Sequence, residues 1–214
     1  MHDHFVTTAK IVGLGSYLPE RVLTNADLEA MVDTSDEWIR TRTGIRERRV
    51  VAEGEALGDL VVRAGASALA DAGVTPVEVD LLILATATVE QPIPATSAIV
   101  QPRMGLVNAA CFDVSAACSG FTYALNVGRQ FIATGEAETV LVVGAECLTR
   151  YVDWTDRSTC VLFGDGAGAA VLKPGEPGEG ILHIKWRTDG RYSDLISMPG
   201  GGCRFPPHSK ESID

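Results

Sequence analysis

Apolar and polar positions alternate in blocks along most of this chain. Short apolar runs have the length of buried strands, and amphipathic segments with helical spacing lie between the early ones. The predicted strands are residues 10–14, 81–85, 110–114, 139–143, 160–163, 167–172 and 181–186. Strands that alternate with helices form mostly parallel sheets whose faces the helices cover, so this order predicts the α/β class.

Residues that commonly cap helices mark where the first helices begin. Thr24 and Asp27 have the spacing of a capping box, which opens a helix that extends through residue 32. Thr34 or Ser35 caps a second, short helix that carries Trp38. A third helix extends from about residue 57 to residue 72 and ends at a glycine.

Cys118 lies between the apolar run 110–114 and a segment with helical periodicity that starts at Phe121. This spacing predicts a cysteine at or near a helix N-terminus, where unpaired N–H groups and the helix dipole stabilise a thiolate. A thiolate is the form in which cysteine acts as a nucleophile. The alternative from spacing alone is a small residue of the core, because unpaired cysteines are often buried.

The composition narrows the function classes. Hydrophobic residues make up 46% of the 214 residues. The chain has 18 Lys and Arg and 28 Asp and Glu, which gives a net charge of −10. An acidic balance argues against general binding to nucleic acid or to anionic membranes. No signal-peptide pattern and no apolar run of about 18 residues is present, so a cytoplasmic location is expected.

The chain contains five cysteines without C-x-x-C spacing, and no His, Asp and Glu cluster has metal-ligand spacing. We therefore expect reduced thiols and neither a metal site nor a disulfide framework. His183 and His208 have no neighbour that would orient them, so structural or solvent-facing roles are favoured. His2 and His4 belong to a terminal segment that is expected to fray.

Five arginines occur between residues 40 and 49 of this acidic chain. Guanidinium groups pair with phosphate oxygens, and the neighbouring Trp38 offers a flat face for an adenine ring. The alternative is a solvated run of charge. Gly164-x-Gly166-x-Gly168 does not match a dinucleotide fingerprint, since no helical pattern follows, and it predicts a tight turn between strands.

Residues 173–180 are rich in Pro, Gly and Glu and form the most evident linker. We therefore expect one α/β unit over residues 1–174, followed by a linker and the start of a second half over residues 175–214.

Several segments together resemble β-ketoacyl-acyl carrier protein synthase III, a thiolase-fold condensing enzyme. They are residues 13–19, 34–39 with 42–45, 113–121, 155–157 and 163–169, and the likeness extends from residue 9 to about residue 199. The resemblance implies the first half of a layered α-β-α-β-α architecture, with a mostly parallel mixed sheet covered by helices. It also implies a cytoplasmic homodimer that acts on acyl-coenzyme A and acyl carrier protein without a cofactor.

The resemblance also assigns the reaction that initiates fatty acid synthesis. Cys118 would accept an acyl group, typically acetyl, from coenzyme A, and malonyl-acyl carrier protein would then lose carbon dioxide and condense with it. Trp38 and Arg157 would clamp the adenine, and Arg42 would contact the coenzyme A phosphates.

Three further residues match positions near the acyl group in that family. Phe163 would lie near the cysteine, and Leu195 would line the acyl tunnel. Ile93 would reach across the dimer interface and limit acyl size. A bulkier side chain is often found at that position, so the resemblance implies a site that admits primers longer or more branched than acetyl.

The family completes its active site with a His, an Asn and an oxyanion-hole glycine that all belong to its second half. No segment of this chain up to Asp214 matches them, and neither His183 nor His208 falls in a corresponding motif. We therefore expect the 214 residues alone to be acylated but not to condense, and to expose a large apolar face.

Two alternatives remain open at this point. One is a non-condensing remnant that binds coenzyme A or a partner chain, and the other is a different thiolase-fold acyltransferase, such as a hydroxymethylglutaryl- or polyketide-type synthase. A nicotinamide-dependent oxidoreductase is disfavoured, because no helix follows the glycine-rich stretch.

Overall fold

A computed structural model describes residues 8–206 of the chain. The chain divides into two units, Met1–Ile184 and Lys185–Asp214, and each is described by itself. The terminal histidines at positions 2, 4 and 208 lie outside the described residues.

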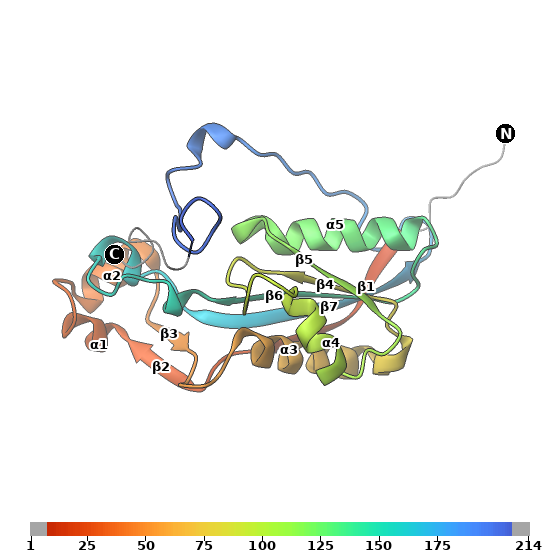
Figure 1. The fold of residues 1–214 in the computed structure, drawn as a ribbon, viewed down its shortest axis with the longest axis horizontal. Helices are drawn as coiled ribbons and strands as arrows, with labels where there is room; N and C mark the ends of the chain where they lie inside the picture. The colour runs from red at the N-terminus through yellow and green to blue at the C-terminus, as the bar shows by residue number, and fades with distance from the viewer. Residues whose placement is uncertain (1–7, 207–214) are drawn as a thin grey trace. The chain divides into compact units, whose positions relative to one another are not determined.

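A five-stranded sheet forms the centre of the first unit (Figure 1). The strands in spatial order are β1 (Thr8–Tyr17), β7 (Asp165–Gly175), β6 (Val140–Cys147), β4 (Leu81–Ala85) and β5 (Ala110–Val114). β4 pairs in parallel with β5 and β6, whereas β7 pairs antiparallel with both β6 and β1. Within this sheet β7 therefore runs against the other strands, which confirms the predicted mostly parallel mixed sheet.

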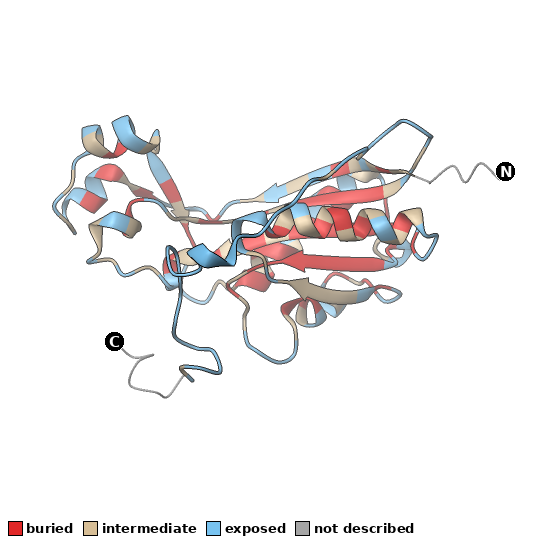
Figure 2. Cartoon of the chain, turned by 90° about the horizontal axis from the view of Figure 1, so that it is seen from above, coloured by how far each residue is buried: buried red, intermediate tan, exposed pale blue. Residues whose placement is uncertain are grey.

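Helices cover both faces of the sheet. α3 (Leu57–Ala72) and α4 (Thr96–Arg103) pack on one face, and α5 (Gly120–Ala133) packs on the other (Figure 1). Side chains along a strand point alternately to the two faces, so Leu82 of β4 packs toward α3 and Ile83 packs toward α5. All five residues of β4 are buried, which explains why its sequence is a continuous apolar run. Figure 2 shows the buried positions concentrated in the sheet and in its covering helices.

Two glycines of β1 let α3 approach the sheet backbone to backbone. A Cβ added at Gly13 would lie 2.5 Å from the backbone nitrogen of Ala72, and one at Gly15 would collide with the backbone of Ala64 and Ala68. Such close approach is a common reason for glycine inside a strand. α3 is thereby fixed on the edge strand of the sheet.

A smaller group of elements gathers at one end of the sheet (Figure 1), and we call it the outer subdomain. It consists of β2 (Arg21–Thr24), β3 (Glu47–Val50), α1 (Asn25–Glu29), α2 (Asp36–Thr43) and α6 (Arg157–Cys160). β2 and β3 pair antiparallel. Leu28, Ile39, Cys160 and Val161 form its buried core, against which Trp38 packs partly buried. Short 3₁₀ helices at Pro76–Glu78, Ala117–Ser119 and Leu148–Arg150 complete the first unit.

The predicted helix caps are confirmed with two adjustments. Thr24 and Asp27 form the capping box, but α1 ends at Glu29 instead of residue 32. Ser35, not Thr34, caps α2, because its hydroxyl accepts a hydrogen bond of 3.1 Å from the backbone N–H of Trp38. α3 spans the predicted residues 57–72 and ends at a left-handed glycine, as predicted.

Three predictions along the C-terminal part are wrong. Residues 160–163 form the end of α6 and a turn instead of a strand, because Asp156 caps a helix at Arg157. The glycine-rich stretch from Gly164 to Gly168 is not a tight turn, since β7 begins at Asp165 and pairs on both sides with β6 and β1. Residues 181–186 form no strand, and Ile181 donates one backbone hydrogen bond of 2.8 Å to Ala9.

The second unit, described over residues 185–206, is largely irregular. Its regular element is a 3₁₀ turn at Gly190–Tyr192, which Asp189 caps through the backbone N–H of Arg191. The same carboxylate accepts two hydrogen bonds, of 2.8 and 2.6 Å, from the Arg191 guanidinium. Over the described part of the chain, no helix is both long and apolar enough to cross a bilayer.

Candidate active site

Cys118 lies where the edge strand β5 passes into α5. β5 ends at Val114, the 3₁₀ turn Ala117–Ser119 contains the cysteine, and α5 begins at Gly120. Ala117 adopts a left-handed backbone with φ of 45°, a conformation that an L-residue takes only at a local cost and that is often found at functional sites. A Cβ at Gly120 would lie 3.3 Å from the Cβ of Ala85, so the helix start is packed closely on β4.

The structure confirms that Cys118 lies at a helix N-terminus and contradicts the alternative of a core residue, because Cys118 is exposed. The buried cysteines of the first unit have a different environment. Burial and the nearby Asp165 raise the pKa of Cys147 to about 12. Burial, and to a smaller extent the negative charge of Asp156, raise the pKa of Cys160. Both stay protonated near neutral pH, which leaves them poor nucleophiles.

Trp38, Arg42 and Arg157 come together on the outer subdomain. Trp38 and Arg42 are four residues apart on α2 and share one face of that helix. The guanidinium carbon of Arg157, on α6, lies 4.2 Å from the centre of the Trp38 ring, and that of Arg42 lies 5.1 Å from it. Both distances are within the range of cation–π interactions.

Three buried polar atoms of this region lack a hydrogen-bond partner among the described residues. They are the hydroxyl of Thr34, directly before the cap of α2, Nε of Arg157 and Nε of Arg48. Buried polar atoms are nearly always paired, so an unpaired one in a binding region is available to a ligand. The sequence pattern predicted Thr34 only as a possible helix cap, because nothing in its spacing marks an unpaired hydroxyl.

The five arginines of the run 40–49 do not form one phosphate site. Arg40 pairs with Asp36 at 3.2 Å, Arg42 lies on Trp38, and Arg49 pairs with Glu47 at 3.6 Å. Arg48 is only 5% exposed and points into the outer subdomain. Neither a single phosphate cluster nor a fully solvated run therefore describes this segment.

The remaining predicted site residues have varied environments. Phe163 is half-buried in the turn between α6 and β7. Ile93 is 85% exposed in the loop between β4 and α4, where its peptide bond to Pro94 is cis. Leu195 belongs to the second unit and is 78% exposed there. Their roles beside an acyl group stay predictions.

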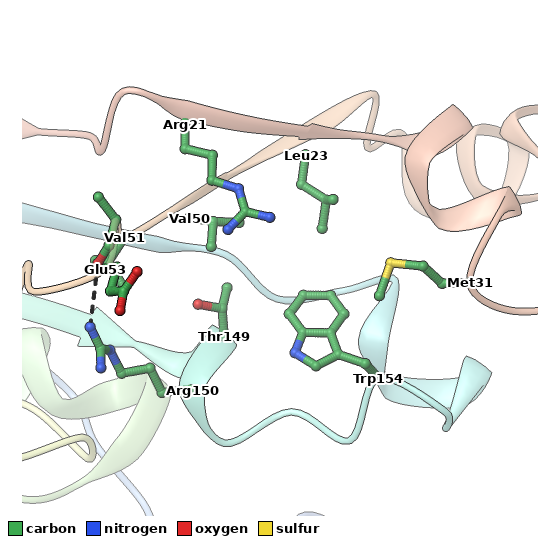
Figure 3. Close-up of a pocket in the computed structure, with 10 residues that line it drawn as sticks. Arg21, Leu23, Met31, Val50, Val51, Glu53, Thr149, Arg150 and Trp154 are labelled. Carbon is green, nitrogen blue, oxygen red and sulfur yellow. Dashed lines mark hydrogen bonds between the residues drawn. The ribbon is translucent and has the colours of Figure 1, made fainter.

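A cavity of about 390 Å³ opens elsewhere in the first unit, between β2, β3 and the segment that follows β6 (Figure 3). Arg21, Met31 and Trp154 line it, and Arg150 closes one side by donating a hydrogen bond of 3.5 Å to the carbonyl of Ala52. None of the predicted site residues lines this cavity. Over residues 8–206, no cluster of three or more His, Cys, Asp or Glu side chains could hold a metal ion.

Comparisons with known proteins bear on this arrangement. The sequence profile of 3-oxoacyl-[acyl-carrier-protein (ACP)] synthase III matches residues 112–190. A β-ketoacyl-[acyl-carrier-protein] synthase III from Caldanaerobacter subterraneus is 52% identical over 206 residues, which cover 96% of this chain and 62% of that protein. The chain thus spans about three fifths of the length of the curated relatives it matches.

Solved structures are similar as well. A 3-oxoacyl-(acyl carrier protein) synthase III from Pseudomonas aeruginosa PAO1 superposes with a TM-score of 0.86 at 45% identity, over 92% of this chain and 62% of that one. The priming β-ketosynthase of a polyketide biosynthetic pathway superposes with a TM-score of 0.77 at 41% identity, over 79% and 51%. The fold is therefore thiolase-like, as predicted.

Proposed function

Because the chain belongs to the β-ketoacyl-[acyl-carrier-protein] synthase III family over the part of its relatives that it spans, we propose that it is the portion of such a condensing enzyme that carries the nucleophile. In the complete enzyme the reaction would initiate fatty acid synthesis. Acetyl-coenzyme A would acylate Cys118, and malonyl-acyl carrier protein would then condense with the acyl group and release carbon dioxide.

The position of Cys118 supports the acyl-transfer step. Its exposed thiol stands at the junction between β5 and α5, where a thioester can reach it. Sγ would attack the carbonyl carbon of the thioester, the bond from that carbon to the coenzyme A sulfur would break, and the coenzyme A thiolate would leave. This step needs an accessible thiolate, which Cys147 and Cys160 do not offer.

The contact between Trp38 and Arg157 supports the binding of the coenzyme A nucleotide. The adenine would insert between the indole and the guanidinium, and Arg42 beside them would pair with a phosphate. At 4.2 Å the two groups touch each other, so the pair must open to about 7 Å for a ring to make contacts of about 3.5 Å on each side. The Arg157 side chain would therefore have to swing away from the indole when the adenine inserts.

The acceptor half of the reaction would use groups that this chain does not show. A His, an Asn and an oxyanion-hole glycine from the second half would stabilise the charge that develops during decarboxylation. In this proposal residues 1–174 form the first half, and residues 175–214 form the linker and the start of the second. The complete enzyme would be a cytoplasmic homodimer that needs no metal or cofactor.

The acyl group would lie near Phe163, and Ile93 would reach it across the dimer interface. Isoleucine occupies less space than the bulkier side chain often found there, so the site would admit primers longer or more branched than acetyl. A polyketide-type priming synthase is the second candidate, favoured by the similarity to a priming β-ketosynthase. Product analysis with different acceptors separates the two.

The observation that carries the proposal is the exposed thiol of Cys118 at the strand-to-helix junction. The test is incubation of the chain with acetyl-coenzyme A radiolabelled in the acetyl group, followed by peptide mapping. We expect label on the peptide that contains Cys118, loss of label in Cys118→Ser, and full label in the matched variant Cys203→Ser. Label on another cysteine, or equal labelling of Cys118→Ser, would contradict the proposal.

A further inference from the structure

Arg48, on β3, is a buried arginine without an acidic partner. It is 5% exposed, and none of the carboxylates in the described part of the chain forms an ion pair with it. Burial lowers the pKa of Arg48, as expected for a cation removed from water. Burying a charge is unfavourable unless hydrogen bonds or an opposite charge compensate it, so the hydrogen-bond partners of this guanidinium are central to its role.

The guanidinium joins two segments that are far apart in the sequence. Its Nη1 donates a hydrogen bond of 2.7 Å to Oδ1 of Asn25, and its Nη2 donates one of 2.6 Å to the carbonyl of Val161. Asn25 is the first residue of α1, and Val161 is the C-cap of α6. Arg48 therefore connects the start of one helix to the end of another.

Asn25 extends this connection to both ends of α2. Its Nδ2 donates hydrogen bonds of 2.8 Å to Oδ1 of Asp36 and of 3.0 Å to the carbonyl of Ile45. Asp36 is the first residue of α2, and Ile45 directly follows its C-cap. We call these hydrogen bonds, together with those of Arg48, the Asn25–Arg48 network.

The network joins the two helices whose side chains meet at the proposed adenine site. α2 carries Trp38 and Arg42, and α6 carries Arg157. α6 has only four residues, far below the length at which a helix holds its own conformation. Its position must therefore come from tertiary contacts, and the Val161 carbonyl is a direct link from α6 to Arg48.

From this geometry we propose that Arg48 is a positioning residue for coenzyme A binding. It sets the spacing between α6 and α2 and thereby places the Arg157 guanidinium on the face of Trp38, without touching the ligand itself. The link to coenzyme A rests on the proposed function, whereas the link to the Arg157–Trp38 contact does not. The two can therefore be tested separately.

The first experiment measures the contact without any ligand. The chain is labelled with 5-fluorotryptophan, and its three tryptophan signals are assigned in ¹⁹F NMR spectra by single Trp→Phe variants. Arg157→Met gives the Trp38 signal of an indole without its guanidinium. We expect Arg48→Met to shift the Trp38 signal toward that reference and Arg48→Lys, which keeps the charge but loses the forked geometry, to shift it part of the way.

The matched control is Arg63→Met. Arg63 stacks on Tyr17 at 4.6 Å, so its loss removes a cation–π contact that does not involve the network. The Trp38 signal should stay at its wild-type position in this variant. A wild-type Trp38 signal in folded Arg48→Met would overturn the proposal, and if that variant does not fold, a wild-type signal in Arg48→Lys would do the same.

The second experiment measures binding by calorimetry. We expect Arg48→Met to weaken coenzyme A binding about ten-fold, the factor that corresponds to about 1.4 kcal/mol. Affinity for pantetheine, which lacks the adenine and its phosphates, should be unchanged, since general loss of structure would weaken both. Equal weakening for both ligands would show that Arg48 only supports the structure in general, and this would overturn the positioning role.

The outcomes for the two proposals are distinguishable. If the wild-type chain does not bind coenzyme A while the ¹⁹F signals respond as expected, the adenine-binding proposal fails and the positioning of Arg157 by Arg48 stands. If coenzyme A binds and Trp38→Ala weakens it, but folded Arg48 variants leave both the signal and the affinity unchanged, only the positioning role fails.

Discussion

The guanidinium carbon of Arg157 lies 4.2 Å from the centre of the Trp38 ring, so these two side chains contact each other directly. A cation–π contact of this kind is worth about 0.5–2 kcal/mol. A ligand that inserts between them must replace that contact with two new ones. The measured affinity for coenzyme A therefore reports a difference between ligand stacking and this internal contact.

Removing the indole should weaken ligand binding. Stacking of a base on an aromatic side chain is worth roughly 1–3 kcal/mol, so we expect Trp38→Ala to weaken coenzyme A binding about ten-fold or more. Trp38→Phe should lose less, because a smaller aromatic face remains. Calorimetry with Trp154→Phe as the control checks this, and an unchanged affinity in Trp38→Ala would count against the clamp.

Cysteine reactivity should follow exposure and position. We expect iodoacetamide, added below one equivalent, to modify Cys118 first, because it is exposed at a helix N-terminus. Cys203 is the informative competitor, since it is also exposed but has no helix behind it. Peptide mapping by mass spectrometry gives the order, and faster labelling of Cys203 or Cys111 would contradict it. In urea all five thiols should react at similar rates.

The buried thiol of Cys147 predicts a loss of stability at high pH. Burial raises its pKa from 9.0 to about 12, so between these values the unfolded chain has lost a proton that the folded chain retains. The folded state binds more protons there, and the contribution of Cys147 to stability falls as the pH rises, by up to about 1.4 kcal/mol per pH unit. Below pH 9 the contribution is fully present.

Urea unfolding of the wild type and Cys147→Ala at several pH values checks this. The alanine variant should lose less stability than the wild type between about pH 9 and pH 10.5. The exposed Cys203→Ala variant should follow the wild type. Parallel curves for the wild type and Cys147→Ala would show that this thiol does not carry the effect.

Asp165 should be important for the connection between the sheet and the outer subdomain. This buried carboxylate, at the start of β7, accepts hydrogen bonds of 2.8 Å from the Val51 N–H, and of 3.0 and 2.6 Å from the N–H and hydroxyl of Thr149. Asp165→Ala leaves these donors without a partner, at a cost of roughly 1–3 kcal/mol for each buried group left unpaired. Urea unfolding measures this, and the exposed Asp33→Asn should stay within about 0.5 kcal/mol of the wild type.

Sequence patterns predicted the strands that form continuous runs of apolar residues. β4 and β5 have the predicted bounds, because a short apolar run between two turn segments fits a strand and is too short for a helix. β2 and β3 were not predicted, since each has only four residues and three of the four residues of β3 are charged. A strand was predicted over residues 167–172, but the start of β7 at Asp165 was taken for a turn, because glycine and alanine have low β-propensity.

The residues of the candidate site also differ in how far local sequence patterns predicted them. A local signal, the junction between a strand run and a helical run, located Cys118 at a helix N-terminus. The meeting of Trp38 with Arg157 depends on tertiary structure between distant segments, and family resemblance alone pointed to it. The burial of Arg48 had no sequence signal, since Arg48 is one of five neighbouring arginines and its partners, Asn25 and Val161, lie far from it along the chain.

The pairing of the first strand with the last strand of the sheet has a consequence for synthesis. β1 hydrogen-bonds to β7 alone within the sheet, with Gly13 opposite Val171, so the ribosome has made most of the chain before β1 can find its partner. Until then β1 is a free edge, the kind of segment that pairs with wrong chains. The glycines that admit α3 also lower the tendency of this strand to pair prematurely. α3 is synthesised long before β7, so it can pack on β1 early and cover the strand until β7 is made. The Gly13 and Gly15 contacts therefore protect the nascent chain from wrong pairing and also pack α3 on the sheet in the folded protein.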